Sequence, residues 1–167
     1  EIESEYVHTD TMIVTTENGG QAFVTFGMGA RVMDSTFGEK RCELVMLTGE
    51  SFDIQSDEFH IIATEITRIS KFPFREDTWI GMGHTLDTSA KFKETFGYEY
   101  FAFKKLPFRT HLSGIDEEIE FLQVIPIYEE EREWCVRNHT IALLDILNEK
   151  YDGKEAEVDF KREMIIP

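Results

Sequence analysis

The tripeptide Gly-Met-Gly occurs twice in this chain, and glycine-rich turns of this kind can bind phosphate groups. The first copy lies in "VTFGMGARVMD", Val24 to Asp34, and the second lies in "WIGMGHTLD", Trp79 to Asp87. A dinucleotide site needs a strand, a G-x-G-x-x-G turn and a helix whose first N–H groups face the pyrophosphate. Neither copy has the third glycine, and neither is followed by a strongly periodic helical pattern. The sequence therefore predicts no nucleotide cofactor at either turn.

Histidine and cysteine side chains can bind metals or act in acid–base catalysis. Cys135 and His139 have the four-residue spacing that places two ligands on one helical face, but two ligands do not complete a zinc site, and we predict no metal. His84 follows the second turn and could act as the general base of a hydrolase, with a carboxylate such as Glu43 or Asp87. A histidine beside a tight turn more commonly bonds a nearby carbonyl, and no nucleophile is identified. The hydrolase is therefore the alternative function.

Carboxylates gather in two clusters along the sequence. The second cluster would lie at a helix N-terminus, where the helix dipole favours each negative charge by about 0.3–1 kcal/mol. Adjacent residues on one helix point in different directions, which does not suit the paired acids of a glycosidase. The two clusters could instead form a negatively charged rim that docks a basic protein. The candidate protein-binding residues are Asp116, Glu117, Glu118, Glu129, Glu130, Glu131 and Glu133.

Hydrophobic patterning predicts the elements that position these residues. "TMIVTT" (11–16) and "AFVTFG" (22–27) flank the turn "ENGG" and indicate a hairpin, and "RCELVML" (41–47) indicates a central strand that is buried on both faces. A helix is expected from Ser56, as its N-cap, to Pro73, which should stop it. Its expected buried stripe comprises Phe59, Ile62, Ala63, Ile66 and Ile69.

The second half of the chain alternates between strand and helix signals. "YEYFAFKKL" (98–106) and "IEFLQVIPI" (119–127) indicate two strands, with Pro126 ending the second. "YEEEREWCVRN" (128–138) and "TIALLDILNEK" (140–150) indicate two helices, with Asn138 as a left-handed stop and Thr140 as the next cap. "EVDF" (157–160) could add an edge strand.

Composition limits the classes of partner. The 167 residues fit a single domain, 1–167, and 33 acidic against 17 basic side chains give a net charge of −16, which argues against binding to nucleic acid or an anionic membrane. No apolar run approaches the roughly 18 residues of a membrane span. The two cysteines lie far apart and are expected to be reduced, buried thiols, so we expect a cytoplasmic protein.

Several of these segments, in this order, resemble the suppressor-of-fused domain family. "FVTFGMGARVM" is followed by "RCELVML", a helix ending in "KFPF", the turn "GMGHTL", and "FLQVIPIYEEEREW". The resemblance spans about Thr11 to Leu147. "GESFDIQSDEF" departs from the family pattern because it lacks the tryptophan often found before the long helix. The matching residues are Thr25, Gly27, Met28, Met33, Glu43, Leu44, Gly83, His84, Thr85, Pro126, Glu129 and Glu131.

The resemblance implies a fold and an activity. The fold is α/β (α+β), with a mixed, mostly antiparallel sheet and flanking helices, in which both Gly-Met-Gly turns would be strand exits whose methionines fill core gaps. Animal relatives restrain a transcription factor by clamping an extended peptide along sheet edges, and stand-alone bacterial relatives are proposed immunity proteins against toxins. The leading hypothesis is thus a non-enzymatic immunity protein whose acidic face docks on a basic toxin, such as a nuclease. A homo-oligomeric scaffold would instead show a large apolar surface patch.

Overall fold

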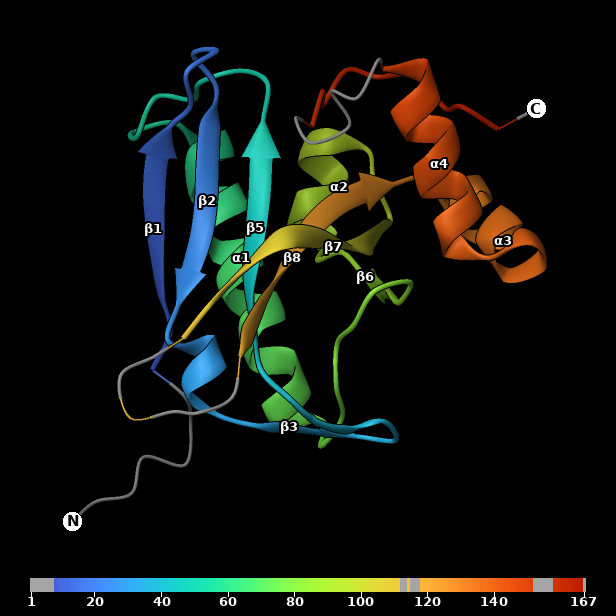
Figure 1. Cartoon of the computed structure of the whole chain (residues 1–167). Helices are drawn as coiled ribbons and strands as arrows, with labels where there is room; N and C mark the ends of the chain where they lie inside the picture. Colours follow the sequence, from blue (N-terminus) through green and yellow to red (C-terminus); the bar gives the residue numbers. More distant parts are fainter. Residues whose placement is uncertain (1–7, 112–113, 115–117, 152–157, 167) are drawn as a thin grey trace.

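The computed structural model describes residues 8–111, 114, 118–151 and 158–166. Within these ranges the chain forms a six-stranded sheet of order β1-β2-β5-β8-β7-β6 and a separate hairpin of β3 and β4 (Figure 1). The strands are β1 (Asp10–Thr15), β2 (Gln21–Phe26), β3 (Met33–Ser35), β4 (Gly38–Lys40), β5 (Cys42–Thr48), β6 (Thr85–Asp87), β7 (Tyr100–Thr110) and β8 (Ile119–Ile127). The helices are η1 (Met28–Ala30, 3-10), α1 (Asp57–Arg75), α2 (Ala90–Phe96), α3 (Glu129–Asn138) and α4 (Thr140–Lys150).

The six-stranded sheet is mixed and mostly antiparallel. Strands β5 and β8 run parallel to each other, and every other pair of neighbouring strands is antiparallel. Figure 1 shows α1 running behind the strands, with α3 and α4 together at one side of the molecule. The predicted fold class is therefore confirmed.

The first half of the sheet follows the local sequence signals closely. Strands β1 and β2 form the predicted hairpin, and Gly19 in its turn has a φ of 85°, a conformation that favours glycine. Strand β5 lies between β2 and β8, and all of its residues except Leu47 are buried. The predicted central strand is therefore confirmed, and its burial on both faces explains its continuous apolar pattern.

Helix α1 supplies the main apolar contact with the sheet. The Ser56 hydroxyl accepts a hydrogen bond from the Phe59 N–H (3.2 Å), as expected of an N-cap, and Ile62, Ile66 and Ile69 of the predicted stripe are fully buried. The prediction that Pro73 ends the helix is wrong, because α1 continues to Arg75 with Pro73 buried in its last turn. A proline so near the end removes only one late N–H donor, and its ring packs into the core.

The sheet has a separate apolar cluster on each face. Phe101 and Phe103 of β7 belong to the cluster that includes α1, whereas Ala102 between them belongs to the cluster beneath α4. This alternation follows from the two-residue repeat of a strand. Helix α4 packs on its side through Leu143, Leu144 and Leu147, so α1 and α4 contact opposite faces.

Several boundaries differ from those that the sequence suggested. Pro126 does not end β8 but lies opposite Phe101 in the β7–β8 ladder, and the strand continues to Ile127. His139, with a φ of 71°, separates α3 from α4, so Asn138 is the last residue of α3 and not the left-handed stop. Thr140 is accordingly the first residue of α4 and not its cap.

Some short elements carry no clear sequence signal. Helix α2, the β3–β4 hairpin and β6 were not expected, because each is too short to show a reliable repeat. Of the suggested edge strand at 157–160, Val158 forms an isolated parallel bridge with Thr48, and Glu157 lies outside the described residues. None of the helices in the described ranges combines the length and apolarity needed to cross a bilayer.

Candidate functional site

Helix α3 carries most of the second acidic cluster. Glu129, Glu130 and Glu133 are exposed, and their spacings of three and four residues place them on one side of the helix. Glu131 points the other way and is completely buried, so it does not belong to the predicted acidic surface. The carboxylates of Glu129 to Glu131 lie in the first turn, where the positive end of the helix dipole stabilises them.

The buried Glu131 side chain forms a two-pronged ion pair with Arg162. Arg162 Nη1 donates to Glu131 Oε1 (2.7 Å), and Nη2 donates to Oε2 (2.6 Å), with 5% and 0% of the two side chains exposed. Burial alone would lower the pKa of Arg162, but the hydrogen bonds and charge of Glu131 outweigh that effect and raise it. Two parallel hydrogen bonds of this kind fix the orientation of the guanidinium relative to the carboxylate as well as the distance between them.

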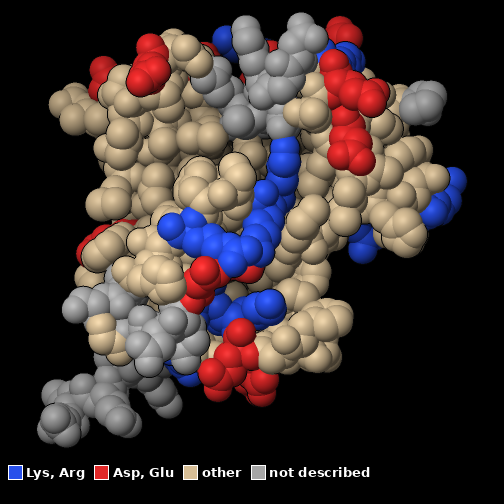
Figure 2. Space-filling view, in the orientation of Figure 1, with Lys and Arg blue, Asp and Glu red and all other residues tan. Residues whose placement is uncertain are grey.

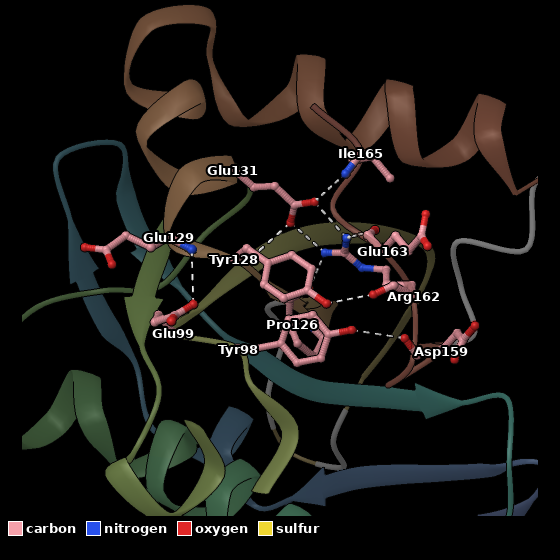
Figure 3. Close-up of polar contacts among 10 residues, drawn as sticks. All are labelled: Tyr98, Glu99, Pro126, Tyr128, Glu129, Glu131, Asp159, Arg162, Glu163 and Ile165. Atoms are coloured by element: carbon pink, nitrogen blue, oxygen red, sulfur yellow. Dashed lines mark hydrogen bonds and ion pairs between the residues drawn. The ribbon is translucent and has the colours of Figure 1, made fainter. Parts of the chain in front are cut away.

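Further contacts tie this ion pair to the end of the sheet and to the C-terminal segment 158–166 (Figure 3). The Tyr128 N–H donates to Glu131 (3.0 Å), and the Tyr128 hydroxyl donates to the Arg162 carbonyl (2.7 Å). Arg162 Nη2 also donates to the Pro126 carbonyl (2.9 Å), and the guanidinium lies over the rings of Tyr98 and Tyr128 at 5.3 and 5.1 Å. The start of α3 is therefore held rigidly by residues that are distant in sequence.

Sequence reasoning missed Arg162 as a structural partner of the acidic cluster. It lies 31 residues after Glu131, in a tail that is too short to show a periodic pattern. Arg162 stands between Lys161 and Glu163, and this short charged stretch does not indicate which carboxylate the arginine meets.

The first acidic cluster is only partly described. Glu118 is exposed and forms an ion pair with Arg109, whereas Asp116 and Glu117 lie outside the described residues. Figure 2 shows the acidic side chains of this face in separate clusters, not in one continuous surface.

Several of the family-motif residues converge on the buried carboxylate of Glu43. The Thr25 hydroxyl donates to Oε2 (2.6 Å), and the N–H groups of Gly27 and Gly29 both donate to Oε1 (2.9 Å each). The Leu44 N–H donates in turn to the Thr25 hydroxyl oxygen (2.7 Å). Burial raises the pKa of the Glu43 carboxyl, although these hydrogen bonds act in the opposite direction. The first Gly-Met-Gly turn therefore binds a carboxylate of its own chain.

The two remaining motif methionines of this region belong to the core. Met28 and Met33 are 1% and 2% exposed and pack in the cluster that contains α1. Met82 of the second turn is 46% exposed. The expectation that both Gly-Met-Gly methionines fill core gaps is thus confirmed for Met28 and wrong for Met82, because nearly half of the Met82 side chain is exposed.

The second turn holds His84 mainly through its backbone and an aromatic contact. Gly83 has a φ of 86°, and the His84 N–H donates to the Gly81 carbonyl (3.1 Å). The His84 ring lies 4.2 Å from the Trp79 ring, between centroids. Burial lowers the pKa of the imidazole, and a hydrogen bond with the Trp79 backbone offsets part of that effect. Thr85 begins β6 beside it.

This geometry does not support the hydrolase alternative. Glu43 is engaged by Thr25 and the first turn, and the cavity of about 430 Å³ beside His84 has no carboxylate among its described lining residues. Asp87 is exposed, at the end of β6. The structure therefore does not bring His84 into a pair with either carboxylate.

The described residues also offer no site for a metal. Among them, no group of three or more His, Cys, Asp or Glu side chains could hold an ion. Cys135 is buried whereas His139 is exposed, so their four-residue spacing does not produce a pair of ligands. Burial raises the pKa of both cysteine thiols, which are free and buried, as predicted.

Comparisons with solved structures give the same fold. A chain of the Sufu–Fu complex superposes with a TM-score of 0.69 at 14% identity, covering 98% of this chain and 79% of that chain. A putative SUFU homologue from Neisseria gonorrhoeae gives 0.67 at 15% identity, covering 100% and 83%. Drosophila Suppressor of Fused gives 0.67 at 11% identity, covering 98% of this chain but only 44% of that longer chain. A search among curated proteins finds no significant match.

A sequence model of one family accounts for most of the chain. The family described as suppressor of fused protein (SUFU) matches residues 5–163. The matched range includes Glu43 with the residues that bond it, the second Gly-Met-Gly turn with His84, and the ion pair of Glu131 and Arg162. This chain therefore belongs to the suppressor of fused family.

Proposed function

We propose that this chain acts as one non-enzymatic, protein-binding domain, and that it neutralises a basic toxin, such as a nuclease, as an immunity protein does. The observation that carries this proposal is the exposed acidic row of Glu129, Glu130 and Glu133 on one side of α3. The buried ion pair of Glu131 and Arg162 fixes the start of the same helix. A charged row on a fixed helix loses little freedom when a partner docks.

The charge of the chain supports a basic partner. A net charge of −16 attracts a protein whose own surface is basic, as the surface of a nuclease is where it meets phosphate. Such attraction speeds association, and salt weakens it because the exposed charges are screened over about 8–10 Å. The binding rate should therefore fall as the salt concentration rises.

Two other observations support parts of the proposal. A similar structure was solved as the Sufu–Fu complex, which shows that a relative with this fold assembles with another protein. Both cysteines of this chain are free thiols, which agrees with a reducing compartment such as the cytoplasm.

The test combines binding with protection from toxicity. The polypeptide encoded beside this chain's gene is produced with and without the chain, and colony formation and the association rate are measured at low and high salt. The triple variant Glu129→Gln, Glu130→Gln, Glu133→Gln should associate about tenfold more slowly at low salt and protect less. The difference in association rate between the triple variant and the unaltered chain should be smaller at high salt.

A matched triple variant separates local docking from total charge. Glu17→Gln, Glu58→Gln and Glu94→Gln remove the same charge from exposed sites elsewhere, including one first-turn helical position. An equal loss in both triple variants would show that only net charge matters. Absence of both binding and protection in the unaltered chain would contradict the toxin partner.

A further inference from the structure

The two edges of the six-stranded sheet are protected differently. Strand β6 forms one edge with only three residues, and Arg68 Nη2 donates to the carbonyl of its last residue, Asp87 (2.7 Å). Strand β1 forms the other edge with six residues, and every residue except Thr11 is exposed. Proteins usually protect an exposed edge with a short strand, charges, a proline or a bulge. Strand β1 is paired with β2 without a bulge, and Asp10 is its only charged residue.

Strand β1 can offer backbone hydrogen-bonding groups to a further strand. In an antiparallel ladder, alternate residues direct their N–H and C=O groups to the same side, so the residues of β1 that are not bonded to β2 direct theirs outward. Among the described residues, no strand pairs with that outer side. The strand is also anchored to α1, because the hydroxyl groups of Thr11 and Thr67 form a hydrogen bond (2.9 Å). Strand β1 therefore presents an extended edge that is already held in place.

The side chains in the middle of β1 are apolar and exposed. Met12, Ile13 and Val14 are 48%, 37% and 52% exposed. Thr11 and Thr15 flank them, so the pattern of one polar, three apolar and one polar residue is the same in both directions of the strand. A two-fold symmetric dimer brings one surface against a copy of itself and therefore needs a self-complementary surface. The pattern of β1 fits a second copy of β1.

One antiparallel register of two β1 strands pairs side chains of the same kind. With the two-fold axis at Ile13, the directly opposite side chains are Ile13 with Ile13, Met12 with Val14, and Thr11 with Thr15. An axis at Met12 or at Val14 would instead place a threonine opposite Ile13. Apolar pairs and threonine pairs across neighbouring strands are each favourable. The pattern therefore selects the register centred on Ile13.

Charge does not oppose this register within the strand. Asp10 would lie opposite Thr16 of the second copy, and not opposite another carboxylate. The two whole chains still repel each other, because each has a net charge of −16. Salt screens this repulsion, so pairing of two copies should strengthen as the salt concentration rises. Attraction to a basic protein should weaken under the same change.

We propose that two copies of this chain associate through their β1 strands, which pair antiparallel about a two-fold axis at Ile13 and join the two sheets. The contact involves one strand of six residues from each copy, so the dimer is weak and forms at high protein concentration. Figure 1 shows β1 at one side of the molecule and α3 at the other. The proposal is therefore independent of the proposed docking of a toxin on α3.

Sedimentation velocity over a wide range of protein concentration tests the association. The mass of the unaltered chain should rise from that of a monomer to that of a dimer, and the dimer should form at lower concentration in high salt. Hydrogen exchange locates the contact. The N–H groups of β1 that are not bonded to β2 should exchange more slowly in concentrated than in dilute protein, and those of α3 should not change.

Two variants test the register. Met12→Lys and Val14→Glu each place a charge opposite an apolar side chain, and both should fold normally because each site is about half exposed. Each variant alone should self-associate about tenfold more weakly, since the altered pair occurs twice in a symmetric dimer. An equimolar mixture of the two should recover most of the affinity, because the introduced lysine of one chain lies opposite the introduced glutamate of the other.

Matched variants make the same changes elsewhere. Met164→Lys and Val136→Glu alter exposed side chains outside β1 and should leave self-association unchanged. A monomer at every concentration and at both salt concentrations would overturn the proposal. A dimer that both β1 variants leave intact, or that the matched variants weaken equally, would also overturn it. A mixture that associates no more tightly than the separate β1 variants would overturn the register centred on Ile13.

Discussion

In the first Gly-Met-Gly turn, residues 27–29, two backbone N–H groups donate inward to the buried Glu43 carboxylate. In the second turn, residues 81–83, Gly81 and Met82 line one cavity, Gly83 lines another, and the methionine is exposed. The first turn is thus closed by a side chain of its own chain, whereas the second is open to solvent.

The difference shows that neighbouring residues decide what a short glycine motif does. Strand β5, which follows the β3–β4 hairpin, brings Glu43 to the first turn, and a Cβ atom on Gly29 would lie only 2.8 Å from Ile119 Cγ2. The second turn is preceded by Trp79, whose ring occupies the space beside Gly81. A carboxylate in one case and an indole in the other therefore decide whether the turn closes or stays open.

The largest expected effect comes from removing the carboxylate that closes the first turn. Glu43→Ala removes the acceptor of the buried Thr25 hydroxyl and Gly29 N–H and of the partly buried Gly27 N–H. We expect the free energy of unfolding to fall by about 4 kcal/mol, since each buried unsatisfied group costs about 1–3 kcal/mol and such costs are not fully additive. Urea unfolding measures this change. Glu39→Ala, at an exposed position of β4, should change it by less than about 0.5 kcal/mol; similar values for both variants would contradict the closed turn.

The two methionines provide a matched pair with a smaller expected effect. Met28→Ala removes a side chain that is 1% exposed and should lower the free energy of unfolding by about 3 kcal/mol. Met82→Ala removes one that is 46% exposed and should cost less than about 0.5 kcal/mol. Thermal or urea unfolding of both variants makes the comparison directly. Equal losses would mean that the second turn is packed as tightly as the first.

The smallest expected effect is a pH dependence in the second turn. Because burial lowers the pKa of His84 in the folded state, the unfolded chain takes up the proton first as pH falls below about 6.5. The stability that neutral His84 contributes is therefore present above pH 6.5 and is lost below it, by about 0.5 kcal/mol or less because the ring is half exposed. His84→Phe keeps a ring beside Trp79 but does not titrate.

Urea unfolding at pH 7.5 and pH 5.5 tests this effect. The unaltered chain should lose more stability between these two pH values than the His84→Phe variant does. An equal loss in both would show that His84 titrates in the folded state as it does in the unfolded chain.

Local patterns in the sequence were sufficient for most of the fold. The β1–β2 hairpin, β5, α1, β7, β8, α3 and α4 all follow from alternation, helical periodicity and turn residues within each segment. Local rules predict that Pro73 ends a helix and that Pro126 ends a strand. Both predictions are wrong because tertiary packing keeps Pro73 inside α1 and Pro126 inside β8. Helix α2, with seven residues, depends on its Ser89 cap and on Gly97, which ends it with a φ of 80°.

The candidate sites were harder to predict because they join residues that are distant in sequence. Glu131 was grouped with exposed neighbours, and only the fold shows that Arg162 binds it inside the protein. The sequence permits Glu43 as a catalytic partner for His84, but in the fold the first Gly-Met-Gly turn engages its carboxylate. Pairing across such separations depends on strand order, which no local pattern specifies.

The ion pair between Arg162 and Glu131 also determines when, during synthesis of the chain, helix α3 is held in place. The segment that supplies Arg162 is joined as well to β5, where the Val158 N–H donates to the Leu47 carbonyl (2.5 Å). Because a chain emerges from the ribosome with its N-terminal part first, β5, β8 and α3 are made before the residues that lock them together. During synthesis, α3 is therefore made before the residues that hold its start in place, and its acidic row is fixed only after Arg162 has emerged.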